Sequence, residues 1–152
     1  MESSAPCIIL LHGFTANKDL KFWKQIADGF FNSGYSVFRF NFRGCGKGKT
    51  RSEGNFEDTT LTSRIQDYES AIDFLKKSDI ISPDSLGSFG HSLGGMVAIC
   101  SNAKAVDSII TLGTPFQIPR YGEPKLPEKN GDYYKLPSGK KFKKEFYEDI
   151  RE

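Results

Sequence analysis

Apolar residues in the first 115 positions form short continuous runs that alternate with stripes of helical spacing. The runs at 7–11, 35–42, 86–90 and 106–112 predict four strands, of which the continuous run 7–11 suits a strand buried on both faces and the run 86–90 is weak. Between these runs, the stripes predict three helices, led by Trp23, Leu61 and Leu93, with Asp19 placed to cap the first. Strands that alternate with helices favour an α/β fold, a three-layer sandwich around a mostly parallel sheet of about four core strands.

The pattern changes after Pro115. Residues 116–141 carry four prolines and keep no periodicity, which predicts a long irregular loop. From Phe142 the stretch FKKEFYEDIRE resembles the opening of a helix. We therefore expect a core at 1–115, followed at 116–152 by an irregular, cap-like segment and the start of a helix.

Composition narrows the class of protein. A chain of 152 residues with 38% hydrophobic content and a net charge of +2 predicts one globular domain that binds neither nucleic acid nor membrane. Cys7 and Cys100 lie in apolar segments and are expected to be buried thiols, and with Cys45 they show no metal-ligand spacing. An odd cysteine count, with neither a leader pattern nor a membrane-spanning run, favours a cytoplasmic location.

The candidate chemistry lies at residues 90–94, where GHSLG fits the G-x-S-x-G nucleophile elbow. Gly90 and Gly94 leave room for a cramped turn, and Gly95 lets the following helix pack close to the sheet. Ser92 would then stand at a helix N-terminus, where negative charge is favoured. A serine that merely caps the helix is the alternative, but the motif follows a predicted strand and a matching turn lies upstream, which favours the elbow.

An oxyanion hole is expected from two backbone N–H groups. The N–H of Leu93, directly after the serine, is the first donor in such elbows. The second comes from a loop after an earlier strand, and the turn formed by His12, Gly13 and Phe14 is suitably placed, with Phe14 as the donor.

A base for Ser92 is missing from the pattern. The chain has two histidines, His12 and His91, and both precede the serine, whereas the fold with this elbow places its histidine last. We expect His91 to be structural, because neighbouring side chains at an elbow point apart, and His12 to order its turn. No lysine is marked as a base. None of the downstream aspartates can be assigned as the triad acid: Asp107, Asp132 and Asp149.

Four segments in order, HGFTANK, YSVFRFNFRGCGKG, SEGNFEDTTLTSRIQDYESAIDFL and FGHSLGGMVA, resemble the α/β-hydrolase superfamily. The resemblance is strongest to the branch of serine esterases and acyl-peptidases that includes cinnamoyl and feruloyl esterases. It implies a partial α/β-hydrolase fold with Ser92 as nucleophile and Phe14 and Leu93 as the oxyanion hole. It also implies hydrolysis of a small carboxylic ester, thioester or amide through an acyl-enzyme, with no cofactor or metal.

The departures from the family set the expected activity. The family continues into a cap, an acid-bearing strand and a histidine loop, so we expect a C-terminally truncated hydrolase with weak activity or none. Extra residues at 48–51 would alter the pocket rim. A non-catalytic binding module, one half of a split hydrolase and an acyltransferase remain alternatives. The open sheet edge at 106–112 would then need a partner chain or a second copy to cover it.

Overall fold

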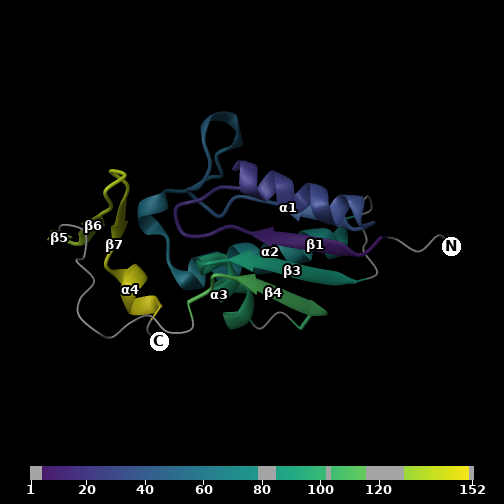
Figure 1. Cartoon of the computed structure of the whole chain (residues 1–152). Helices are drawn as coiled ribbons and strands as arrows, with labels where there is room; N and C mark the ends of the chain where they lie inside the picture. The colour runs from purple at the N-terminus through teal and green to yellow at the C-terminus, as the bar shows by residue number, and fades with distance from the viewer. Residues whose placement is uncertain (1–4, 79–84, 102–103, 116–128, 151–152) are drawn as a thin grey trace.

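The computed structural model describes residues 5–78, 85–101, 104–115 and 129–150, and every structural statement below refers to them. Its central sheet is parallel, with the strand order β2-β1-β3-β4 (Figure 1). The strands are β1 (Cys7–Leu11), β2 (Ser36–Arg39), β3 (Leu86–His91) and β4 (Ser108–Leu112). The prediction of a mostly parallel sheet of about four core strands is confirmed.

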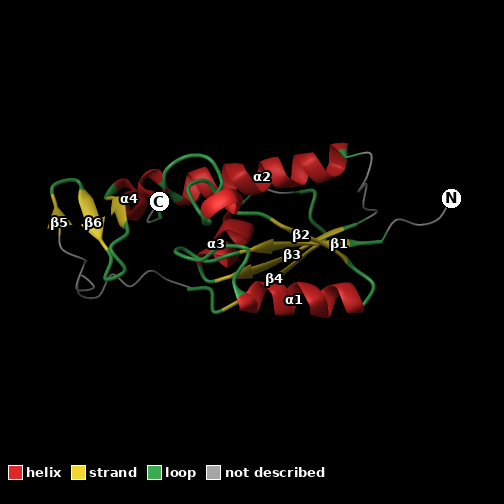
Figure 2. Ribbon diagram, turned by 90° about the horizontal axis from the view of Figure 1, so that it is seen from above, coloured by secondary structure: helices red, strands yellow, loops and turns green. Residues whose placement is uncertain are grey.

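Helices cover both faces of this sheet. Figure 2 shows α1 (Lys21–Asn32) on one side and α2 (Leu61–Lys77) with α3 (Leu93–Cys100) on the other. The sequence of β1 explains the layering, because successive side chains of a strand point to opposite faces. Ile8 and Leu10 join a core cluster with Trp23 of α1. Ile9 and Leu11 join the larger cluster formed with α2 and α3.

The two long helices start differently. The N-terminus of α2 has a capping box in which Ser63 N–H donates to Thr60 Oγ1 and Thr60 N–H donates to Ser63 Oγ, both at 3.0 Å. At α1 the N-cap position is Leu20, which supplies no side-chain cap. The prediction that Asp19 caps this helix is wrong, because Asp19 lies one residue too early and its carboxylate pairs with Lys18 at 2.9 Å.

Two strands are shorter than their apolar runs. In β2 the pairing ends at Arg39, and the N–H of Phe42 beyond it donates to the imidazole of His12 instead of to a strand. At β4 the strand begins at Ser108, because Asp107 instead closes the start of the β3–β4 pair through its carboxylate and the N–H of Leu86.

The C-terminal segment is more regular than its sequence predicts. The part at 116–128 lies outside the described residues, but from 129 onward the chain forms a second, antiparallel sheet and a short helix. The elements are β5 (Lys129–Asn130), β6 (Tyr133–Lys135), β7 (Lys141–Lys143) and α4 (Glu145–Asp149). The prediction of an irregular loop is therefore wrong over 129–141, and the helix expected from Phe142 begins at Glu145, because Lys141–Lys143 form β7. Strands of two or three residues are too short to leave a periodic signal.

The segment 129–150, on the left in Figure 1, packs on the main core. Phe142 and Phe146 belong to the same buried cluster as β1 and α2, and their rings lie 5.1 and 4.5 Å from the ring of Phe14. The carboxylate of Asp149 accepts hydrogen bonds from the N–H and hydroxyl of Thr62, in the first turn of α2. The division of the chain at residue 115 stays a prediction.

The thiols do not all follow the sequence prediction. Cys7 is buried as expected, and Cys45 is buried as well, whereas Cys100 is exposed. Cys100 ends α3, and no described element covers the outer side of that last turn, where Ile99 is also 58% exposed. None of the helices within the described ranges has both the length and the apolar character that a membrane crossing requires.

Candidate active site

Ser92 stands in a strained turn between β3 and α3. Its φ of 52° makes it the one non-glycine residue with positive φ in the part of the chain that the structure describes. The turn is held because Ser92 N–H donates to Leu112 O at 2.9 Å and Gly95 N–H donates to Ser92 O at 3.0 Å. Strain of this kind persists only where the surroundings enforce it, and it is common at active sites.

The glycines around Ser92 are required by close packing. A Cβ added at Gly90 would lie 2.6 Å from the backbone of Gly94 and Gly95. A Cβ at Gly94 would overlap the carbonyl of Leu11, and one at Gly95 would overlap the Thr114 hydroxyl. The motif therefore brings α3 directly against the end of β1.

The HGFT turn (residues 12–15) follows β1 and lies beside this serine. A Cβ placed on Gly13 would lie 3.4 Å from Ser92 Cβ and 3.5 Å from His91 Nδ1. Among the described residues, the N–H groups of Phe14 and Leu93 have no hydrogen-bond acceptor. Both donors are therefore unpaired within these residues, and their joint action as an oxyanion hole stays a prediction.

His12 is fully engaged in building the HGFT turn. Its Nδ1 lies 2.8 Å from Gly13 O, so this nitrogen must carry the proton, and its Nε2 accepts the N–H of Phe42 at 3.3 Å. Burial is the main reason that its pKa falls to about 3, with the positive charge of Arg64 acting in the same direction. His12 is thus neutral, and neither nitrogen is free to take a proton from Ser92.

His91 points its ring toward α1. Its centroid lies 5.6 Å from the ring of Phe22 and 6.4 Å from that of Trp23. Within the described ranges, no hydrogen bond joins the Ser92 hydroxyl to an imidazole, lysine or carboxylate. The elbow thus holds a serine without a bound base in this part of the chain.

The three aspartates considered as triad acids serve other contacts. Asp107 accepts from the N–H of Leu86 at 2.9 Å, and Asp149 binds Thr62. Asp132 lies 3.6 Å from the ammonium of Lys144. None of these contacts involves the elbow or the HGFT turn.

Arg64 is a residue of this region that the sequence analysis overlooked. Its side chain is fully buried in α2, and its Nη2 donates to the carbonyl oxygen of Phe14 at 2.9 Å. A signal existed, because Arg64 occupies a position on the apolar stripe of the helix, three residues after Leu61 and four before Tyr68. A charged residue on a core stripe needs a special partner.

An open hollow lies elsewhere on the molecule. A cavity of about 520 Å³ flanks the β2 edge, between Phe38, Phe40 and the ion pair of Arg43 with Asp67. No residue of the elbow or of the HGFT turn lines it. We therefore place the candidate active site at Ser92 on geometry, independently of this hollow.

The sequence comparisons identify relatives. Residues 6–140 match the family described as the alpha/beta hydrolase fold. A thiohydrolase, aneE of Aspergillus aculeatus, is 34% identical over 101 residues, which are 64% of this chain and 30% of the relative. The chain spans about a third of the length of the curated relatives it matches.

Solved structures agree with the fold. Est1E of Butyrivibrio proteoclasticus, solved with ferulic acid bound, superposes with a TM-score of 0.74 at 23% identity and covers 95% of this chain and 60% of its own. The esterase Pf2001 of Pyrococcus furiosus superposes with a TM-score of 0.59 at 29% identity, covering 68% and 40%.

Proposed function

The chain belongs to the alpha/beta hydrolase fold family, and from that premise we propose that it is a serine hydrolase of small carboxylic esters or thioesters, with Ser92 as nucleophile. The observation that carries the proposal is the strained backbone of Ser92, with φ at 52°, between β3 and α3. A cap-type serine would not need this conformation. The thiohydrolase relative supports including thioesters.

In the proposed reaction, Ser92 Oγ attacks the acyl carbon and the carbonyl oxygen becomes an oxyanion. The N–H groups of Phe14 and Leu93 stabilise that charge, and the alcohol or thiol leaves with a proton. Water then attacks the acyl-enzyme, releasing the acid and restoring the serine. Transfer of the acyl group to another acceptor would share the first half of this reaction.

The proposed rate is low for this chain alone. Neither histidine of the sequence is placed to deprotonate Ser92, since His12 is buried and doubly bonded and His91 packs beside Trp23. Loss of the general base costs several orders of magnitude in serine hydrolases, yet the oxyanion hole keeps some rate. The alternatives are a second chain that supplies the base and a purely binding role, since no base contacts Ser92 among the described residues.

The test is labelling of the purified protein with a fluorescent fluorophosphonate, which reacts with activated serines. We expect slow labelling of the wild type, none of Ser92→Ala, and full retention in Ser101→Ala. Ser101 is a suitable control because it lies at the other end of α3, bonded to Ala98 O.

Two outcomes would contradict the proposal. Equal labelling of Ser92→Ala and wild type would place the reactive group elsewhere. A wild type with a cooperative unfolding transition and no label would make this chain alone a non-catalytic module.

A further inference from the structure

Three consecutive carbonyls of the HGFT turn each accept a hydrogen bond from a different side chain. Gly13 O faces His12 Nδ1 at 2.8 Å, and Phe14 O accepts from Arg64 Nη2 at 2.9 Å. Thr15 O accepts from Lys140 Nζ at 3.2 Å. His12 adjoins the turn in sequence, Arg64 comes from α2, and Lys140 comes from the C-terminal segment. The backbone of the turn is therefore anchored from several parts of the molecule.

We propose that Arg64 is a positioning residue: it fixes the peptide plane that follows Phe14 and so completes the anchoring of the turn that carries the Phe14 N–H. This inference rests on the proposed function, because it assigns Arg64 a task in the same site. It does not make Arg64 a catalytic residue, since its contact is with a backbone carbonyl and not with the reacting atoms.

Peptide geometry explains how the contact works. In a trans peptide the carbonyl oxygen and the next N–H point in opposite directions. The bond from His12 to Gly13 O thus fixes the direction of the Phe14 N–H, while the bond from Arg64 to Phe14 O fixes the following peptide plane. Together they hold both sides of the Phe14 backbone, and neither contact uses the N–H itself.

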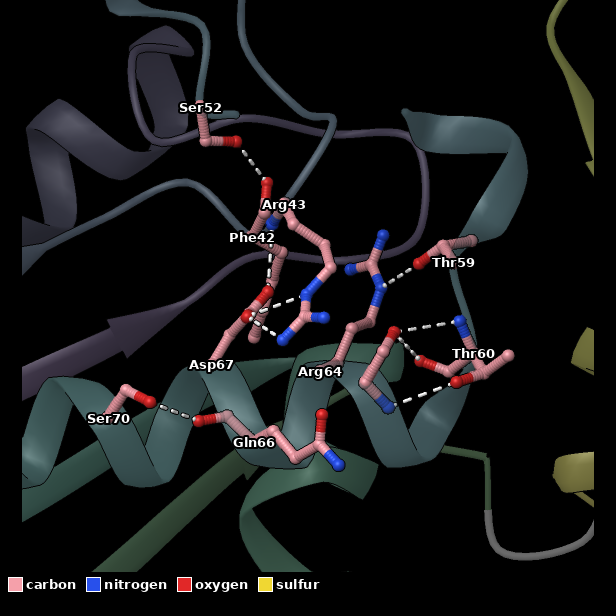
Figure 3. A network of polar contacts seen from close by, with 10 residues as sticks. Phe42, Arg43, Ser52, Thr59, Thr60, Arg64, Gln66, Asp67 and Ser70 are labelled. Atoms are coloured by element: carbon pink, nitrogen blue, oxygen red, sulfur yellow. Dashed lines mark hydrogen bonds and ion pairs between the residues drawn. The ribbon is translucent and has the colours of Figure 1, made fainter. Parts of the chain in front are cut away.

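Arg64 is itself held rigidly. Its Nε donates to Thr59 Oγ1 at 2.9 Å, a contact drawn in Figure 3, and its guanidinium carbon lies 4.8 Å from the centroid of the Phe42 ring. The nearby carboxylate of Asp67 is bound instead by the backbone and side chain of Arg43 (Figure 3). Because the guanidinium is fixed relative to α2, its bond to Phe14 O holds the turn in a fixed position relative to that helix.

The charge of Arg64 is unusual for a purely structural side chain. Within the described residues no carboxylate pairs with it, and its Nη1 is buried without a partner. A buried cation without an ion pair destabilises a fold, so a well-packed apolar residue would serve stability better. Beside the oxyanion donor, however, the positive charge also favours an anion at that point.

The test compares Arg64→Met, Arg64→Lys and the control Tyr68→Phe. Tyr68 lies one turn further along α2 and is equally buried, and its hydroxyl bonds Ser88 rather than the turn. Two quantities are measured: the maximal rate of fluorophosphonate labelling at saturating probe, and amide hydrogen exchange in the peptide spanning residues 12–16. Ala16 N–H reports on the turn, because it donates to Gly13 O at 3.3 Å.

We expect Arg64→Met to lower the maximal labelling rate by roughly ten- to a hundred-fold, less than the effect of deleting an oxyanion donor, with little change in probe affinity. Exchange should accelerate in the 12–16 peptide and not around Ser92. Arg64→Lys should recover part of both, because an ammonium can still donate to Phe14 O. Tyr68→Phe should change neither, whatever it costs in stability.

The outcomes separate this inference from the proposed function. A folded Arg64→Met protein with wild-type exchange at 12–16, or with faster exchange and an unchanged labelling rate, would overturn the positioning role. If the wild type takes no label, the proposed function fails, and exchange alone decides whether Arg64 holds the turn. Should Arg64→Met not fold, Thr59→Val loosens the same guanidinium and must show the same two changes.

Discussion

At the scale of single residues, the protonation state of His12 couples the pH to the stability of the HGFT turn. Its imidazole is buried and neutral, with one nitrogen facing Gly13 O and the other accepting from Phe42 N–H. Protonation would put a hydrogen on Nε2, which must then stop accepting. The low pKa of His12 is therefore both a cost of burial and a condition for the turn.

This arrangement predicts a pH-dependent stability. The pKa of His12 is about 3 in the folded chain and 6.5 when unfolded, so between these values only the unfolded state binds the proton. Stability should fall as the pH is lowered, by about 2 kcal/mol between pH 7 and pH 5 from this group alone. Urea unfolding at both pH values measures it, and His12→Gln should flatten the dependence. A variant with the wild-type slope would show that other groups cause it.

The sequence indicated some residues of the candidate site but not others. The GHSLG spacing pointed to Ser92, and the structure places that serine in a strained turn beside Gly13. The sequence did not show Arg64, because its partner is a backbone carbonyl fifty residues away rather than a side chain of opposite charge. Any residue type can offer a backbone carbonyl, so the identity of the partner residue gives no sign of such a contact.

At the scale of elements, the close approach of α3 to the sheet gives a prediction with an internal control. Gly94→Ala should destabilise the fold by about 2 kcal/mol or more, because its Cβ meets the backbone carbonyl of Leu11, which cannot turn away. Gly95→Ala meets the side chain of Thr114 instead. Adding Thr114→Gly should therefore restore part of the loss for Gly95→Ala and none for Gly94→Ala. Thermal unfolding measures both, and equal rescue would contradict the packing argument.

Among the secondary-structure elements, the sequence predicted some and not others. Cys7–Leu11 was predicted to the residue, because a strand buried on both faces is a continuous apolar run. Strands β5 to β7 were missed, since their burial depends on a few aromatic contacts with the core, such as that of Phe142 with Phe14. Short strands held by tertiary packing carry no local period, so the C-terminal sheet could not be read from the chain.

At the scale of the whole molecule, the sheet is unevenly protected. Strands β1 and β3 are covered by helices, whereas every residue of β4 is exposed, including the apolar side chains of Ile109, Ile110 and Leu112. In the described part of the chain, β4 pairs with β3 on one side and with no strand on the other. An apolar edge strand of this kind promotes association with other chains.

The last prediction follows from that edge. Ile110 is 47% exposed, so Ile110→Lys should leave the free energy of unfolding within about 0.5 kcal/mol of wild type while reducing concentration-dependent association. Phe31→Lys is the matched control, because Phe31 is 70% exposed but lies on α1. Sedimentation velocity over a tenfold range of concentration distinguishes the two variants. If both reduce association equally, general surface hydrophobicity drives it and the β4 edge has no special part. If only Ile110→Lys does, the edge is the contact surface, and a base for Ser92 can be sought in whatever chain binds there.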